Sequence, residues 1–199
     1  MYLQTILIGT AVGDALGVPV EFQPRSYLKA NPVIDMREYG THEQPKGTWS
    51  DDTSLMLCLA ECMREGLDSN TLAQKFIAWK NDNLWTPHGW VFDIGIGTRL
   101  AIERLESGMT PELAGGLDER DNGNGSLMRI LPLVLHIKDL DIDERYEWTK
   151  KISSITHAHV RSVMACFYYL EFAKKIIDGK EKFQAYNELQ SELTQYFDQ

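Results

Sequence analysis

The chain has 199 residues, of which 43% are hydrophobic and 25% are charged, and both values are ordinary for a soluble globular protein. This length predicts one large domain, residues 1–199, with enough material for a buried core. The formal net charge of −9 argues against nucleic acid and membrane as partners, since both favour a basic protein surface. A phosphate-bearing small ligand stays compatible with this charge, because backbone N–H groups and helix dipoles can bind phosphate.

The cysteine residues and the N-terminal segment indicate in which cellular compartment the protein is expected. Cys58 and Cys62 lie one helical turn apart in an apolar segment, which favours buried, reduced thiols over a disulfide framework. Residues 1–20 are apolar, but they lack a basic start and contain Asp14 and several glycines. That pattern is not typical of a targeting or membrane-spanning segment. We therefore expect a cytoplasmic protein.

The first predicted element is a helix, because apolar residues recur at helical spacing from residue 3 to residue 16. Gly9, Gly13 and Gly17 form a stripe of small residues along it. Interior glycine costs roughly 1 kcal/mol relative to alanine, so we expect the close approach of another helix or of a ligand. Asp14 lies within the same apolar helix and needs a partner, either a cap or salt bridge, or a metal.

The segment from residue 22 to residue 49 is rich in Pro, Gly and Tyr and predicts a long irregular loop. Helical periodicity with start and stop residues predicts seven further helices, and strand-like alternation is scarce. The sequence therefore indicates an all-α, single-domain protein. The predicted helices are Thr53–Glu65, Thr71–Lys80, Ile94–Ser107, Ser126–Ile137, Asp143–Ile155, Val160–Asp178 and Glu181–Tyr196.

The stretch "KGTWSDDTSLMLCLAE", residues 46–61, places two adjacent carboxylates where an apolar helix begins. Ser50, Asp51 or Asp52 can cap that helix by accepting hydrogen bonds from its free N–H groups. One acidic residue is enough for a cap. The second, flanked by Ser50 and Thr53, also creates the cluster of hard oxygen atoms that Mg²⁺ or Ca²⁺ prefers. On this segment alone, both interpretations stand.

The stretch "DERDNGNGSLMRILPLVL" contains a turn-forming run from Asp121 to Ser126 before a predicted helix. Glycines and small polar residues in that position can present N–H donors to a phosphate. The run matches neither G-x-G-x-x-G nor a Walker sequence, so an ordinary loop with Ser126 as helix cap is the alternative.

Histidine and aromatic residues form two weaker patterns. His157 and His159 precede a long apolar helix, but residues two apart do not share a helix face, so a two-His metal site is not expected. Trp85, Trp90 and Phe92 surround a polar loop and are either core residues or a stacking surface for an adenine.

In chain order, the segments "GDALGVPVEF", "GTWSDDTSLMLCLAE", "FDIGIGTR", "DNGNGSLMRILPL" and "ITHAHVRSVMAC" resemble the ADP-ribosylglycohydrolase family, which includes the dinitrogenase-reductase-activating glycohydrolases. The resemblance runs from about Gly9 to Ala173. It implies an orthogonal helical bundle with two Mg²⁺ ions in a cleft, and with Mn²⁺ as an alternative metal. The implied reaction is hydrolysis of the glycosidic bond between ADP-ribose and a protein side chain or small molecule, so the expected partner is ADP-ribose or an ADP-ribosylated substrate.

The resemblance also assigns roles to individual residues. Ser50, Asp51 and Asp52 match metal ligands in the family's T/S-D-D-T motif, and Asp51, Asp52 and Glu21 match catalytic positions near the scissile bond. A G-N-G-x-x-M-R loop matches the segment that holds the diphosphate and proximal ribose, and a histidine at the head of a later helix matches a ribose contact. These expected substrate-binding residues are Gly123, Asn124, Gly125, Ser126, Met128, Arg129 and His157.

One departure concerns the family's second metal motif, a G-G-D-x-D-T type sequence on a late helix. No D-x-D-T occurs after His157, and Asp141 with Asp143 is interpreted as a helix cap. We therefore expect a C-terminally shortened domain that holds two ions, one or none. The leading hypothesis is a metal-dependent hydrolase. The alternatives are an ADP-ribose-binding relative with weak or no turnover, and a structural remnant without a ligand.

Overall fold

The computed structural model describes residues 2–197, so Met1 and residues 198–199 of the expected domain lie outside the described part. Within it, the chain forms helices, turns and two isolated β-bridges, which confirms the all-α class. The α-helices are α1 (Tyr2–Gly17), α2 (Arg25–Ala30), α3 (Asp51–Gly66), α4 (Ser69–Asp82), α5 (Ile96–Glu106), α6 (Pro111–Ala114), α7 (Val134–Ile137), α8 (Ile142–Ser154), α9 (Val160–Ile177) and α10 (Lys182–Phe197). The short 3₁₀ turns are η1 (Val18–Val20), η2 (Gly40–His42), η3 (Glu119–Asp121) and η4 (Leu131–Leu133).

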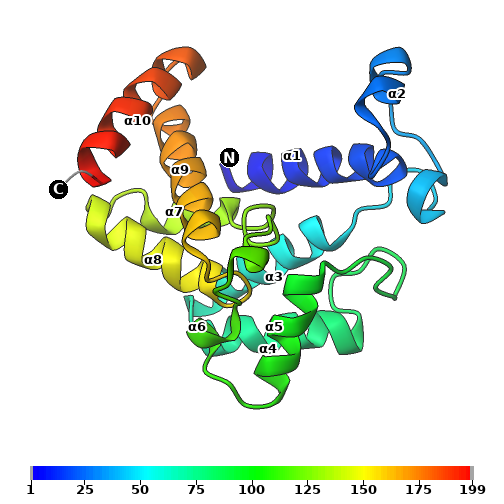
Figure 1. Ribbon diagram of the computed structural model, residues 1–199, viewed down its shortest axis with the longest axis horizontal. Coiled ribbons are helices and arrows are strands. Elements are labelled where there is room, and N and C mark those ends of the chain that lie inside the picture. Colours follow the sequence, from blue (N-terminus) through cyan, green and yellow to red (C-terminus); the bar gives the residue numbers. More distant parts are fainter. Residues whose placement is uncertain (1, 198–199) are drawn as a thin grey trace.

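Helix α3 contributes to the centre of the core and contacts α1, α4 and η4 (Figure 1). Its Leu55 and Leu59 are fully buried and belong to one apolar cluster with residues of α4 and α9, including Phe76, Trp79 and Leu170. Burying one such side chain contributes roughly 1.5–3 kcal/mol. This packing fixes the direction of α3 and therefore the position of the acidic residues at its N-terminus.

The C-terminal helices form a second, smaller apolar cluster. Helix α10 packs on α9 through Phe167, Leu189 and Leu193. Helices α8 and α9 are also joined by Arg145, whose Nε and Nη2 donate to the two carboxylate oxygens of the buried Glu171 at 2.6 and 2.7 Å. Figure 1 shows α10 beside α9 at one end of the molecule, with α2 at the other end.

The expectation of one continuous helix over Ser126–Ile137 is wrong. The first part of this segment is a turn, followed by η4 and the short α7. Pro132 has no N–H and cannot donate the helical hydrogen bond to the Met128 carbonyl. The turn is held instead by Arg129, whose buried guanidinium donates to the Gly125 carbonyl at 2.8 Å.

Most other local expectations are confirmed. Asp141 caps α8, as expected, by accepting from Glu144 N at 2.9 Å, and the structure shows that Asp68 likewise caps α4 by accepting from Thr71 N at 2.8 Å. The segment 22–49 is mostly irregular, although it includes α2 and η2. The three cysteines are buried and unpaired, as predicted for reduced thiols.

Helix α1 differs from the expectation in one respect. It contacts α3 and η4, yet Ala15 is its only buried residue in the described range. No other part of residues 2–197 approaches Gly9, Gly13 or Gly17 closely, since a Cβ at each position would meet no atom of another element within 4 Å, and the approach of a ligand stays a prediction. Gly13 and Gly17 line an acidic cleft, and Gly9 lines a separate groove.

Candidate functional site

Asp14 of α1 caps the N-terminus of α3. Its Oδ1 accepts from Ser50 Oγ at 2.8 Å, and its Oδ2 accepts from Ser50 N at 2.9 Å, Thr53 N at 3.1 Å and Thr53 Oγ1 at 2.6 Å. Ser50 Oγ in turn accepts from Asp52 N at 3.3 Å. These partners satisfy free N–H groups at the start of the helix. The carboxylates of Asp51 and Asp52 are therefore not required as caps.

Asp51 and Asp52 form part of a crowded acidic group. The pKa of Asp51 rises to about 8, first because the side chain is buried and then because Asp93, Asp52 and Asp14 lie nearby. The pKa of Asp52 rises to about 7, because of burial and of repulsion from Asp14, Glu21 and Asp93. Buried carboxylates that repel one another are either protonated or compensated by a cation. In the described part of the chain, no Lys or Arg is among the residues that line this cleft.

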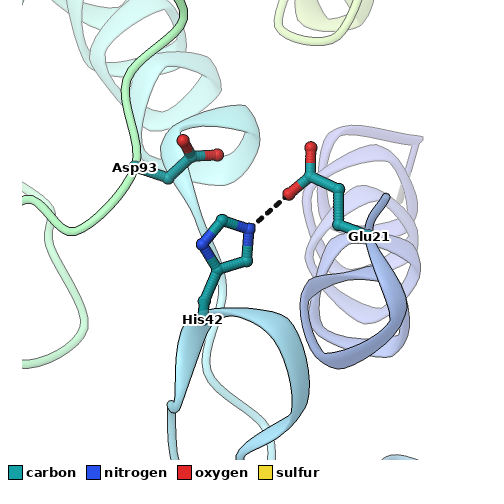
Figure 2. Close-up of side chains that lie close together, drawn as sticks. All are labelled: Glu21, His42 and Asp93. Carbon is teal, nitrogen blue, oxygen red and sulfur yellow. Dashed lines mark hydrogen bonds and ion pairs between the residues drawn. The ribbon is translucent and has the colours of Figure 1, made fainter. Parts of the chain in front are cut away.

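Glu21, His42 and Asp93 converge beside this acidic group (Figure 2). Glu21 follows η1, His42 ends η2, and Asp93 precedes α5. His42 Nε2 lies 2.6 Å from Glu21 Oε2. One possible ligand atom from each of these three residues lies within 4.8 Å of those of the other two. Within residues 2–197, Asp51 and Asp52 do not form such a group with a third His, Cys, Asp or Glu side chain. Metal ligation by Ser50, Asp51 and Asp52 stays a prediction.

His157 lies buried against the cleft, and three glycines provide the space for its ring. A Cβ added at Gly97 or Gly123 would lie 3.0 or 3.4 Å from its Nε2, and one added at Gly125 would lie 2.5 Å from its Cε1. Burial, with a smaller contribution from Arg129, lowers the pKa of His157 to about 4. The imidazole is therefore neutral at pH 7, and the glycines leave it accessible from the cleft.

Two of the expected substrate-binding residues, Ser126 and Arg129, have side chains that lie behind the loop, and their substrate-binding role stays a prediction. Ser126 is fully buried, and its Oγ accepts from Ser153 Oγ at 2.9 Å and lies 3.3 Å from Cys166 Sγ. Arg129 is also fully buried and donates to the Ile152 carbonyl at 3.1 Å, in addition to its bond to the loop. Neither side chain lines the cleft. Ser126 instead attaches the loop to α8 and α9, and Arg129 attaches it to α8.

A cleft of about 600 Å³ brings the other expected residues together. This volume lies within the range typical of small-molecule sites. The expected residues that line it are Glu21, Ser50, Asp51, Asp52, Gly123, Asn124, Gly125, Met128 and His157.

The aromatic residues considered for adenine stacking lie elsewhere. Trp85 donates from Nε1 to Glu61 at 3.0 Å, and Trp90 contacts Phe92 edge to face at 5.7 Å between ring centroids. Neither tryptophan lines the cleft, whereas Phe22 does and is 81% exposed. Phe22 is therefore the aromatic ring that the cleft offers to a ligand.

Asp93 and His42 are site residues that the sequence did not assign. Asp93 lies in "FDIGIGTR", a segment already noted for its resemblance, and a carboxylate three residues before a helix is a signal that marks it. His42 lies in the irregular segment, where no periodicity indicates which way a side chain points. Only the folded chain places it against Glu21.

Comparison with known proteins agrees with this site. The chain is 30% identical over 184 residues to the ADP-ribosylarginine hydrolase Tri1 of Serratia proteamaculans, covering 91% of this chain and 49% of the relative. It is 34% identical over 181 residues to the protein of the same name in Pseudomonas putida, covering 88% and 47%. It is 29% identical over 189 residues to the ADP-ribosyl-[dinitrogen reductase] glycohydrolase of Rhodospirillum rubrum, covering 87% and 57%. The chain thus spans about half the length of these curated relatives.

A solved structure, described as an ADP-ribosylglycohydrolase-related protein complex, superposes with a TM-score of 0.72 at 30% identity, over 93% of this chain and 59% of the other. Fold and site together define an all-α protein with an acidic cleft at the N-terminus of a core helix and a glycine-rich loop across from it. The chain belongs to the ADP-ribosylglycohydrolase family, whose sequence profile matches residues 3–199.

Proposed function

We propose that this chain contributes a cleft that binds ADP-ribose for hydrolysis of its glycosidic bond to a modified substrate. The observation that carries the proposal is that Asp51 and Asp52 line the same cleft as the Gly123–Gly125 loop. Two relatives are named ADP-ribosylarginine hydrolases, so we propose ADP-ribosylated arginine as the first substrate class to test. The buried, unpaired thiols are compatible with the cytoplasmic location that we propose.

The acidic end of the cleft suits a divalent cation. Asp51 and Asp52 would hold Mg²⁺ or Mn²⁺, with Ser50 beside them, because their crowded carboxylates supply hard oxygen ligands without a compensating Lys or Arg in the described cleft lining. When bound, such an ion lowers the pKa of a coordinated water and orients hydroxyl groups.

The remaining residues have roles that follow from their positions. His42 holds one oxygen of Glu21 at 2.6 Å, which leaves the other carboxylate oxygen free to accept a proton from a water or ribose hydroxyl. The imidazole of His157 is neutral, so it can form a hydrogen bond with a ribose hydroxyl and carries no positive charge that would attract an anion. Gly123, exposed at the cleft, allows a diphosphate to approach the backbone of the loop.

The direct test is calorimetry of the 199-residue chain with ADP-ribose, with and without Mg²⁺. We expect Gly123→Val to weaken binding at least about tenfold, since it adds a branched side chain in the cleft. Its Cβ would meet no atom closer than His157 Nε2 at 3.4 Å, so we expect the variant to fold. Asn122→Val is the matched control, because Asn122 is exposed in the same loop and does not line the cleft. A folded wild-type chain that binds no ADP-ribose either with or without Mg²⁺ would overturn the proposal.

The second candidate is ADP-ribose binding without appreciable turnover. The observation that favours it is that Asp51 and Asp52 belong to no group of three close metal-ligating side chains in residues 2–197. Release of free ADP-ribose from ADP-ribosylated arginine distinguishes the two candidates. Metal-dependent release supports the hydrolase, whereas binding with no release supports the binding protein.

A further inference from the structure

Phe22 is an aromatic residue that the fold holds in the cleft without packing it into the core. It lines the cleft, yet 81% of its surface is exposed. Its backbone has a φ of +62°, a left-handed conformation that is uncommon for a bulky residue and that costs stability. An exposed ring held in a strained backbone conformation indicates contact with a ligand and not a role in folding.

The neighbours of Phe22 place its ring at the acidic end of the cleft. The ring centroid lies 6.1 Å from that of His42, and His42 Nε2 lies 2.6 Å from Glu21 Oε2. Figure 2 shows the carboxylates of Glu21 and Asp93 facing each other beside the His42 ring. The Phe22 ring therefore lies next to the carboxylates that are proposed to act at the glycosidic bond.

The chemistry of ADP-ribose then determines which part of a substrate meets this ring. Two phosphates and both riboses lie between the adenine and the glycosidic bond. If that bond lies beside Glu21, the adenine lies at the other end of the ligand, beyond the diphosphate that the Gly123–Gly125 loop is proposed to hold. The group next to Phe22 is therefore the leaving group, which is the modified side chain of the substrate.

The charges around Phe22 favour a cationic leaving group. Glu21, Asp52 and Asp93 line the same cleft, and no Lys or Arg of residues 2–197 does so. Asp93 makes no hydrogen bond or ion pair with Glu21 or His42, so neither of them occupies its carboxylate. A guanidinium is planar and positively charged, stacks on aromatic rings and donates to carboxylates. The oxygen of a modified serine is neutral and can do neither.

We propose that Phe22 makes the cleft specific for a guanidinium leaving group, which stacks on the Phe22 ring and donates to the Asp93 carboxylate. This inference rests on the proposed function, because it takes the glycosidic bond to lie at the acidic end of the cleft. It adds the residue that distinguishes arginine-linked from serine-linked ADP-ribose. Stacking of the adenine on Phe22 is the alternative that the experiment excludes.

The test is calorimetry in EDTA, where the proposed metal-dependent cleavage does not proceed. The three ligands are free ADP-ribose, ADP-ribosylated arginine and ADP-ribosylated serine. The variant is Phe22→Leu, which keeps an apolar side chain but has no aromatic face for a cation. We expect it to fold, because the ring that it removes is 81% exposed. Tyr39→Leu is the matched control, since Tyr39 is exposed, also has a φ of +62° and does not line the cleft.

We expect the wild type and Tyr39→Leu to bind the arginine-linked ligand roughly tenfold more tightly than the serine-linked ligand. Phe22→Leu should lose this preference through weaker binding of the arginine-linked ligand alone, and Phe22→Tyr, which keeps an aromatic face, should retain it. Thermal denaturation checks that each variant is folded.

Two results overturn the inference and leave the proposed function standing. In the first, Phe22→Leu weakens free ADP-ribose as much as the arginine-linked ligand, which assigns the ring to the adenine. In the second, the wild type binds free ADP-ribose but does not distinguish the arginine-linked from the serine-linked ligand. A folded wild type that binds none of the three ligands, in EDTA or with Mg²⁺, overturns the proposed function together with the inference.

Discussion

Asp14 on α1 and Ser50 at the start of α3 form a two-point contact, in which Asp14 Oδ1 accepts from Ser50 Oγ at 2.8 Å and Asp14 Oδ2 accepts from Ser50 N at 2.9 Å. One helix thereby caps another. The contact orders the start of α3 and brings α1 to the edge of the cleft. It also leaves the next two carboxylates, Asp51 and Asp52, without a capping role, so their crowding needs a different explanation.

The first prediction concerns this cap. Asp14→Ala removes four hydrogen bonds to a carboxylate, and we expect it to lower the free energy of unfolding by ~2–3 kcal/mol. Urea denaturation measures the change. Asp68→Ala is the matched control, because Asp68 caps α4 at an exposed site and its loss should cost only ~1 kcal/mol. Equal costs for the two variants would contradict an inter-helix role for Asp14.

The second prediction concerns the acidic pair. In EDTA, Asp51→Asn/Asp52→Asn should melt at a higher temperature than the wild type, because it removes repulsion among buried carboxylates. With saturating Mg²⁺ or Mn²⁺ the order should reverse, since a metal at a hundred times its Kd stabilises the wild type by ~2.7 kcal/mol.

Thermal denaturation at pH 8 with a metal titration checks this reversal. Asp82→Asn removes an exposed carboxylate outside the cleft and is the control. The assignment fails if the double variant responds to metal as strongly as the wild type does.

The third prediction concerns pH. The pKa of His157 is lowered from 6.5 to about 4, mainly by burial, with Arg129 lowering it further and Asp121 opposing. Between these values the unfolded chain binds more protons than the folded chain, so this histidine's contribution to stability is lost as pH falls from about 6.5 toward 4.

We expect wild type to lose ~2 kcal/mol more than His157→Gln when urea denaturation is compared at pH 7 and pH 4.5. Comparing the two proteins removes the contributions of groups that titrate in both. His136→Gln, which removes an exposed histidine, is the control. Parallel losses in wild type and His157→Gln would show that burial does not keep His157 neutral.

The fourth prediction concerns the support of the glycine loop. Arg129 bridges the carbonyls of Gly125 and Ile152 and lies over the Phe76 ring at 4.8 Å. A lysine lacks the planar group needed to make both bonds, so Arg129→Lys should cost ~2–4 kcal/mol and speed amide exchange in the loop.

The comparison for this variant is Arg99→Lys, which alters only a half-exposed ion pair with Glu103 on one helix. A pair of that kind contributes less than ~0.5 kcal/mol. If Arg129→Lys is equally mild, the loop does not depend on the guanidinium. Urea denaturation and hydrogen exchange give the two readouts.

Local patterns in the sequence were sufficient for most of the helices and for the acidic helix start. Apolar spacing from Leu55 onward and a polar residue before it predict α3, because both depend on neighbours within a few residues. The same reasoning failed for residues 126–137, where Pro132 and the buried Arg129 replace one helix with a turn and two short elements. The prediction failed because it gave more weight to the apolar spacing of this segment than to Pro132, which interrupts helical hydrogen bonding.

Which residues meet across the cleft was decided by the tertiary structure. Asp14 and Asp93 lie far from Asp51 in the sequence, and their approach depends on the packing of α1 and of the segment before α5 around α3. His42 reaches Glu21 because η1 and η2 contact each other, although nothing periodic marks the irregular segment. The sequence by itself determined the helices and the residue types available for chemistry, since these follow from local hydrogen bonding and amphipathic spacing. The acidic cleft exists only after long-range packing has overcome the repulsion among the carboxylates that it brings together.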